Sequence, residues 1–349
     1  ILSSGSSETI RTNVPANCRL LVQIFSHLYP KYEKLPPVIQ ILPLHQNPSS
    51  SPDYNMNLET FLCTLLPILS GFAGYQPYYY YTQAGREFSS YELFPFFLLT
   101  EKKLLLLSSD MMTCIFTENP EAIHAYQQEF RRVLENSSQF FLQSDSPDRI
   151  LNIFDSIMQT NISTNFALES HPCLALMSYG PGFIQSLFDN RDIDLSDPVY
   201  TQLAAVLNQT SFAFTEAAFS CNYFTLSGIR KFARTGLLDG PYSYHQTPLP
   251  KEERKKALRH LLDTDMGHEK CRILKPSVLP ETGIHLEVLS DYSVFLCFLS
   301  EKDTFLCIYL KETSIGQALN DYLCSLSEEE SVYTKKEARQ ILLGLLEQL

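Results

Sequence analysis

The order helix, strand, three-strand meander, helix is expected twice along this chain. It is predicted first from about Leu58 to Glu135, and again from about Lys251 to Leu326. The turn Leu99-Thr100-Glu101 aligns with Leu289-Ser290-Asp291 when the two stretches are superposed. Strand–turn–strand patterns are common, so a match by chance is the alternative to a duplication. A duplicated module restricts the chain to two related halves, each with its own sheet.

Alternating apolar residues and short polar turns predict the meander in both copies. The first closing helix is expected to begin at Asn119-Pro120-Glu121, because asparagine caps helices and proline fits the first turn. The second is expected from Ile315 to Leu326, where apolar residues recur at helical spacing. The predicted strands are Tyr78–Thr82, Phe96–Thr100, Lys102–Ser108 and Met111–Thr117 in the first copy, and Cys271–Lys275, His285–Leu289, Ser293–Leu299 and Thr304–Leu310 in the second.

Two further stretches suggest that each half is longer than the module. A helix at 17–32 followed by a strand at Val38–Leu44 is echoed by a helix at 146–159 followed by a strand within Phe166–Met177. We therefore expect an α+β fold of two related halves, each a β-meander sheet with flanking helices, plus a helical middle segment. The predicted divisions are a leader or linker at 1–16, a first half at 17–145, a second half with a helical insertion at 146–327, and a C-terminal helix at 328–349.

Charge disfavours nucleic acid as a direct partner of this chain. The 349 residues carry a net charge of −12, which repels a phosphate backbone. The densest basic stretch, from Lys251 to Arg259, lies on a predicted helix with Glu252 and Glu253 interleaved. A solvated helix face is therefore favoured over a nucleic-acid contact.

The nine cysteines form no CxxC pair and most lie within apolar runs, such as Cys297. They are expected to behave as small core residues in a reducing compartment, which favours the cytoplasm. Clustered cysteine and histidine ligands of a metal site are absent, and no motif indicates a cofactor. No apolar run of about 18 residues is present, so no membrane-spanning segment is expected.

No pattern in the sequence matches a known catalytic motif. His268-Glu269-Lys270 begins the phospholipase-D-type His-x-Lys-x4-Asp pattern, but Lys275 stands where Asp is required. His171-Pro172-Cys173 is better explained by a core cysteine beside a capping histidine than by a catalytic pair. Gly180-Pro181-Gly182 lacks the lysine of a phosphate loop, and the acidic stretch Asp189–Asp197 lacks calcium-loop spacing. We therefore predict no catalytic residues, no metal ligands and no enzymatic activity.

The concentration of tyrosines between Tyr75 and Tyr91 offers a candidate ligand site. On a strand, Tyr79 and Tyr81 share one face, and with Tyr91 they present apolar rings with hydrogen-bonding tips. The alternative is that one tyrosine face packs in the core and the other lies at an interface. We predict Tyr79, Tyr81 and Tyr91 as ligand-binding residues.

Three stretches resemble the C-terminal effector region of XRE-type helix-turn-helix transcriptional regulators. They are Tyr223–Gly236, Pro250–Arg254 leading into a leucine-rich helix, and Asn119-Pro120-Glu121 leading into the next helix. In such proteins a small DNA-binding domain precedes this region, and this chain lacks it. The resemblance implies sensing and dimerisation, and it provides no catalytic residues.

We therefore predict a non-catalytic ligand-sensing or dimerisation region of a transcriptional regulator. The expected partners are a small molecule or peptide, DNA only through the missing N-terminal domain, and a second copy in a homodimer. An enzyme whose site is assembled from distant residues is one alternative, because folding brings such residues together without a sequence motif. A protein–protein interaction scaffold is the other.

Overall fold

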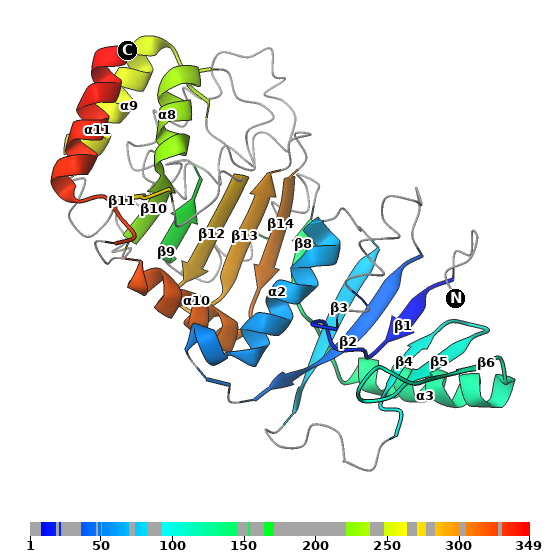
Figure 1. Cartoon of the computed structure of the whole chain (residues 1–349). Coiled ribbons are helices and arrows are strands. Elements are labelled where there is room, and N and C mark those ends of the chain that lie inside the picture. Colours follow the sequence, from blue (N-terminus) through cyan, green and yellow to red (C-terminus); the bar gives the residue numbers. More distant parts are fainter. Residues whose placement is uncertain are drawn as a thin grey trace. The chain divides into compact units, whose positions relative to one another are not determined.

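Two seven-stranded sheets organise the chain in the computed structural model (Figure 1). One sheet belongs to the compact unit Ile1–Phe141 and the other to the unit Leu142–Leu349. We call these units 1 and 2. The structure describes residues 8–18, 21, 36–46, 48–49, 51–69, 74–82, 93–144, 153, 164–170, 221–237, 248–263, 271–276, 283–299, 305–326 and 330–349.

Unit 1 has the strand order β6-β5-β4-β1-β2-β3-β7. Its strands are β1 (Ile10–Thr12), β2 (Val38–His45), β3 (Tyr75–Thr82), β4 (Phe96–Leu99), β5 (Leu104–Leu107), β6 (Cys114–Thr117) and β7 (Ser138–Gln139). Strands β1, β2 and β3 are parallel to one another, and every other neighbouring pair is antiparallel. The predicted meander is therefore confirmed as β4-β5-β6.

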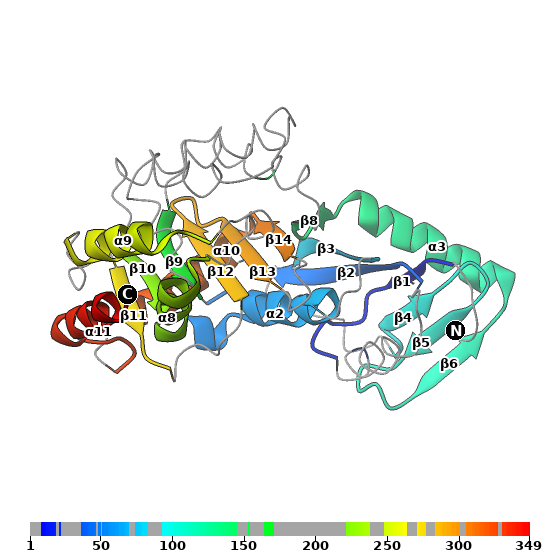
Figure 2. The same cartoon turned by 90° about the horizontal axis from the view of Figure 1, so that it is seen from above.

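Two α-helices of unit 1 pack against its sheet. Helix α2 (Met56–Leu69) follows the short helix η1 (Pro52–Tyr54) and contacts β2 and β3. The Asn57 side chain joins α2 to β2, because it accepts from the His45 N–H and donates to the His45 carbonyl. Helix α3 (Pro120–Glu135) contacts β4, and Figure 2 shows it running along this sheet. Ile123 and Phe130 of α3 are buried in a core cluster with Ile41, Phe97, Leu99 and Leu104.

The predicted start of α3 is confirmed at the level of hydrogen bonds. Asn119 Oδ1 accepts from the N–H groups of Glu121 and Ala122, which the helix itself leaves without partners. We expect Asn119→Ala to lower the free energy of unfolding by about 1 kcal/mol, because both N–H groups then lose their acceptor. Urea denaturation measures the change. Asn119→Asp keeps an acceptor oxygen and is the control; equal losses in the two variants would contradict a capping role.

Unit 2 has the strand order β11-β10-β9-β12-β13-β14-β8. Its strands are β8 (Leu142–Ser144), β9 (Thr164–Glu169), β10 (Cys221–Thr225), β11 (Cys271–Leu274), β12 (Gly283–Leu289), β13 (Val294–Leu299) and β14 (Phe305–Leu310). Strands β9, β10 and β11 are parallel, and the remaining pairs are antiparallel. The second predicted meander is confirmed as β12-β13-β14.

The two sheets share six strands in the same order. Reading β6-β5-β4-β1-β2-β3 in unit 1 and β14-β13-β12-β9-β10-β11 in unit 2 gives the same sequence of parallel and antiparallel neighbours. The predicted α+β fold with two related halves is therefore confirmed. The expected equivalence of Val38–Leu44 with the strand near Phe166 is wrong, because β2 corresponds to β10 and β9 corresponds to β1. Strand β1 also corrects the expected leader at 1–16, since it lies between β4 and β2 inside the sheet.

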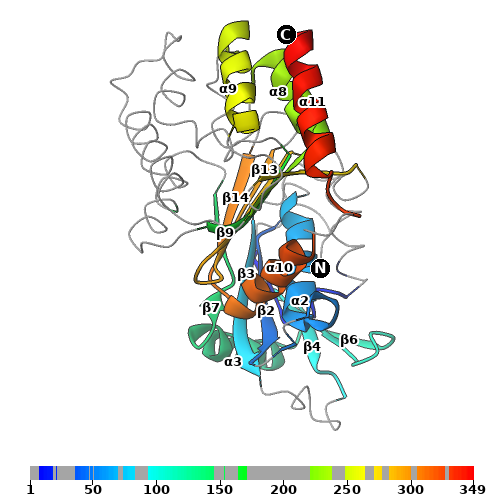
Figure 3. The same cartoon turned by 90° about the vertical axis from the view of Figure 1, so that its left-hand side faces the viewer.

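Four helices of unit 2 are described: α8 (Leu226–Thr235), α9 (Lys251–Asp263), α10 (Thr313–Ser325) and α11 (Lys335–Gln348). Helices α8, α9 and α11 lie side by side, and α10 lies apart from them against β9 and β12 (Figures 1 and 3). Helix α8 ends at Gly236, as predicted; Gly236 has φ of 73° and is the left-handed cap. Arg254 of α9 donates to the carbonyls of Ala233 and Arg234, which joins α9 to the end of α8.

The basic stretch on α9 is a solvated helix face. Lys255 pairs with Glu252 and Lys256 with Glu253, each three residues apart along the helix. The interleaved glutamates therefore neutralise part of the stretch, as the spacing predicts.

The cysteines differ from the prediction in two ways: two of them are joined by a disulfide, and Cys114 and Cys324 are exposed rather than in the core. Cys297 and Cys307 are directly opposite on β13 and β14 and form a disulfide. Six other described cysteines are free thiols. Among the described residues no helix is long and apolar enough to cross a membrane. The helices expected at 146–159 and at most of 17–32, and the motifs at His171, Gly180, Asp189 and His268, lie outside the described residues.

Candidate functional site

A cluster of buried polar side chains lies on one face of the unit 2 sheet, across the neighbouring strands β12, β9 and β10. Glu169 ends β9, Asn222 lies on β10, and His285 and Glu287 lie on β12. Glu169, Asn222 and His285 are each no more than 5% exposed. Ionisable side chains are rarely buried so deeply unless they are paired, so their arrangement requires explanation. We call these four residues the acid–histidine cluster.

Strand pairing brings the cluster together from distant parts of the sequence. Strand β12 runs antiparallel to β9, and His285 lies directly opposite Glu169. Side chains alternate along a strand, so Glu287 shares the face of His285. Strand β10 runs parallel to β9 on its other side and places Asn222 beside Ala167, on this same face.

The end of β9 is fixed by three further hydrogen bonds. The Ser170 N–H donates to the Ile284 carbonyl, and the Ile284 N–H donates to Ser170 Oγ. Thr225, the N-cap of α8, donates its hydroxyl proton to the Ser170 carbonyl. These bonds join the backbones of β9 and β12 next to the Glu169–His285 pair, so the geometry of that pair is set by rigid elements.

Both ring nitrogens of His285 contact a carboxylate. Nδ1 lies 3.1 Å from Glu169 Oε2, and Nε2 lies 2.6 Å from Glu287 Oε1. Asn222 Nδ2 donates to Glu169 Oε1 at 2.6 Å, and Thr164 Oγ1 donates to Glu287 Oε2 at 2.9 Å. Each carboxylate is thus oriented by a neutral donor while it accepts from the imidazole.

The charges of the two glutamates decide the protonation state of His285. Burial lowers the pKa of His285, but the hydrogen bonds and charges of Glu169 and Glu287 outweigh burial and raise this pKa to about 10. His285 is therefore an imidazolium at neutral pH, with both N–H groups donated to carboxylates.

The two carboxylates differ in their exposure to solvent, and one buried oxygen of the cluster has no partner. The Glu169 side chain is 1% exposed, whereas the Glu287 side chain is 12% exposed, so solvent reaches the Nε2 side first. Asn222 Oδ1 is buried and has no hydrogen-bond partner among the described residues. An unsatisfied buried acceptor costs about 1–3 kcal/mol, and such costs are typical of sites held for function.

The equivalent face of unit 1 holds a neutral cluster. Gln40 on β2 donates to the Val14 carbonyl and accepts from the Tyr75 hydroxyl, and Thr12 on β1 donates to the Phe97 carbonyl. Burial is the first cause that raises the pKa of Tyr75, so its phenol stays protonated. The buried ionisable cluster therefore lies in unit 2, whereas these described residues of unit 1 are neutral.

Two of the three predicted ligand-binding residues, Tyr79 and Tyr81, are among the residues that the structure describes. Tyr79 and Tyr81 share one face of β3, as expected, with ring centroids 5.4 Å apart. The Tyr79 ring also lies 5.5 Å from the Phe140 ring, so one side of it packs against an aromatic cluster. Tyr91 lies outside the described residues. A ligand site at Tyr79, Tyr81 and Tyr91 stays a prediction.

Sequence reasoning missed the whole acid–histidine cluster. The one available signal was Ile284-His285-Leu286-Glu287-Val288, where polar residues occupy alternate positions of a predicted strand. That alternation is also what a solvent-exposed face gives. Within the described residues, no group of three or more His, Cys, Asp and Glu side chains has the arrangement of a metal site.

Comparison with known proteins gives little beyond this geometry. No family model matches the chain, and no curated protein matches it. A similar solved structure is that of a yeast tyrosyl-DNA phosphodiesterase H432N mutant, at 9% identity and a TM-score of 0.23, covering 89% of this chain and 85% of that one. This similarity is to an enzyme, so the predicted non-catalytic regulator region is corrected and not pursued. A TM-score of 0.23 supports nothing more specific, and no reaction or residue role is transferred.

Proposed function

We propose that this chain is an enzyme whose site is assembled around Glu169, His285 and Glu287. The observation that carries the proposal is the asymmetric environment of His285. Its Nδ1 is held by a deeply buried carboxylate, and its Nε2 faces the more exposed Glu287. A carboxylate on Nδ1 fixes the orientation of the imidazole and leaves Nε2 as the nitrogen that exchanges a proton with a substrate.

The residues of the cluster take distinct roles under this proposal. His285 is the proton donor, since its raised pKa keeps it charged at neutral pH. Glu169, oriented by Asn222, stabilises the imidazolium. Glu287 occupies the position at Nε2 that a substrate oxygen or nitrogen would take, and Thr164 holds Glu287 there. The reaction class is hydrolysis or group transfer with general acid catalysis at the leaving group.

The test is a hydrolysis assay with chromogenic nitrophenyl esters, glycosides and phosphodiesters. We expect turnover of at least one class, and a 10²–10⁴-fold lower kcat in His285→Gln, the order expected for losing a general acid. His124→Gln, on the exposed surface of α3, is the matched control and should keep full activity. Circular dichroism at the assay temperature shows that each variant is folded.

Two outcomes would overturn the enzyme proposal. One is no turnover in any substrate class by the folded wild-type protein. The other is turnover that His285→Gln retains in full.

A cytoplasmic location, expected from the free cysteines, stays a prediction.

A further inference from the structure

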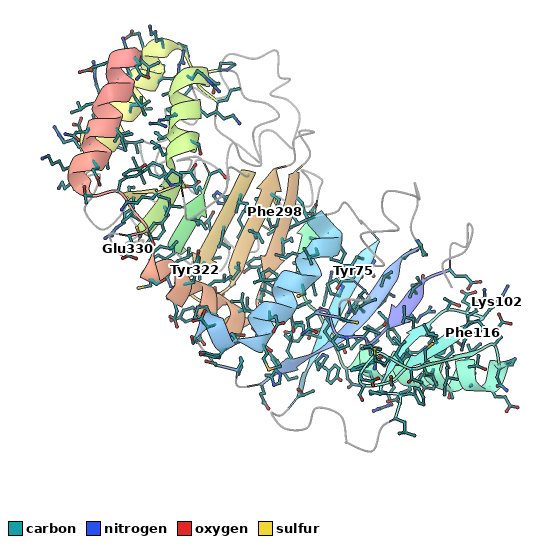
Figure 4. The ribbon with its side chains drawn as sticks, in the orientation of Figure 1. Tyr75, Lys102, Phe116, Phe298, Tyr322 and Glu330 are labelled. Atoms are coloured by element: carbon teal, nitrogen blue, oxygen red, sulfur yellow. A yellow bond between two sulfur atoms is a disulfide. The ribbon has the colours of Figure 1, made fainter. Side chains whose placement is uncertain are left out.

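Within the described part of unit 1, strand β6 forms an apolar sheet edge with no strand paired on its outer side. It is the outermost strand on its side of the sheet, and within the described residues it pairs only with β5. Ile115 is 45% exposed and Phe116 is 53% exposed, and Cys114 is also exposed. Figure 4 shows Phe116 at the margin of this sheet. Edge strands in soluble proteins normally carry a lysine, a proline or a bulge that blocks pairing, and Cys114–Thr117 has none of these.

The other sheet edges are shorter or covered. Strand β7 has two residues, both polar, and β8 has three. The edge at β11 is covered by residues 331–333: the Tyr333 N–H donates to the Ile273 carbonyl, and the Lys275 N–H donates to the Ser331 carbonyl. The equivalent of β6 in unit 2 is β14, and β14 is paired with β8 in antiparallel register. The fold therefore accepts an added antiparallel strand at this position.

The pairing with β5 determines which backbone groups of β6 point outward. The Thr113 carbonyl accepts from the Ser108 N–H, which makes these two residues a hydrogen-bonded pair. Hydrogen-bonded and non-hydrogen-bonded pairs alternate along an antiparallel ladder. Ile115 and Thr117 therefore direct their N–H and C=O groups toward β5, while Cys114 and Phe116 direct theirs to the open edge.

We propose that β6 pairs antiparallel with β6 of a second copy of this chain. A two-fold axis normal to the sheet places Cys114 opposite the second copy's Phe116, and Ile115 opposite its own equivalent. This register forms four N–H to C=O bonds from the outward groups of the two strands. It also buries Ile115 on one face and Phe116 on the other, so the exposed apolar side chains are covered on both sides of the joined sheet. The open edge is self-complementary in this arrangement and needs no other protein.

The interface is small, so we expect the dimer to be weak. Four residues per copy bury less than a standard protein–protein interface, so we expect a dissociation constant on the order of 10 µM or weaker. Sedimentation velocity across concentrations on both sides of this value should show a reversible monomer–dimer equilibrium. A monomer at every concentration would overturn the proposal.

Phe116→Pro removes the outward N–H without touching the hydrogen bonds to β5. Proline is tolerated on an edge strand where the N–H faces outward, so the fold should be kept. Two interfacial hydrogen bonds are lost in the dimer, and we expect the dissociation constant to rise at least about tenfold. Phe116→Ala keeps the N–H and is the control, with a smaller rise. Unchanged dimerisation of Phe116→Pro would contradict pairing through this edge.

A cross-linking experiment tests the register independently of stability. In a Cys114→Ser background, Ile115→Cys should form an intermolecular disulfide under mild oxidation, because residues facing each other across the axis have Cβ atoms about 4.5–5.5 Å apart. Phe116→Cys in the same background faces position 114 instead and should cross-link much less. Equal cross-linking of both variants, or of neither, would exclude the proposed register.

Discussion

The Gly316→Ala variant is expected to lose about 3 kcal/mol or more of unfolding free energy. A Cβ at position 316 would lie 1.7 Å from the Tyr292 carbonyl oxygen and 2.6 Å from its carbonyl carbon. Both atoms belong to the backbone, so no side chain can rotate away to make room. The Tyr292 backbone is itself held, with its N–H donated to the Leu289 carbonyl and φ at 61°. Helix α10 or the β12–β13 turn would therefore have to move.

Gly344→Ala is the matched control for this substitution. Gly344 also lies within a helix, α11, and apart from its chain neighbours and the nearby backbone of that helix, no atom lies within 4 Å of the Cβ it would gain. Alanine is favoured over glycine in a helix interior by about 0.5–1 kcal/mol, so this variant should be slightly more stable. Guanidinium denaturation of both variants gives the comparison. A Gly316→Ala variant as stable as the wild type would show that the turn and α10 are not in tight contact.

The unfolding free energy should fall as the pH rises, because His285 loses its charge. Its pKa in the folded protein is about 10, above its ordinary value of 6.5. The stability that its charge contributes is therefore fully present below about pH 6.5 and is lost as the pH rises through 10. The unfolding free energy should decline by on the order of 1.4 kcal/mol per pH unit inside this window.

Breaking the cluster should lower the unfolding free energy at a fixed pH. Glu169→Ala removes the carboxylate from Nδ1 and leaves a buried imidazolium with Glu287 alone, which should cost about 3–5 kcal/mol at pH 7. His285→Gln should lose the pH-dependent decline, and His124→Gln on α3 should keep it. Urea denaturation from pH 6 to 10 measures both effects. A decline that persists in His285→Gln would have to come from another group.

Locally determined elements were predictable from the sequence. The meanders, the Asn119 cap of α3 and the Gly236 end of α8 depend on residues that are neighbours in the chain, and all were predicted where they occur. The position of each strand within its sheet was harder to predict from the sequence. Strand β1 is three residues long, and its place between β4 and β2 depends on partners that are 28 residues away on β2 and 86 to 88 residues away on β4.

The acid–histidine cluster was not predictable for a related reason. Glu169 and His285 are separated by 116 residues and meet only because β12 pairs with β9. His285 and Glu287 alternate with apolar residues, which gives the same pattern as a strand with one face in water. Sequence periodicity reports which residues share a face, but it does not report which strand lies beside that face.

The central position of β1 has a consequence for synthesis of the protein. Its neighbours β2 and β4 leave the ribosome later, and β4 is complete only when residue 99 has been made. A nascent chain therefore leaves one side of Ile10–Thr12 unpaired until β4 has been made, even after β2 is available on the other side. In unit 2, β9 similarly waits for β12, more than a hundred residues later. Slow translation between these strands would prolong exposure of unpaired strand edges, which favours aggregation of the nascent chain.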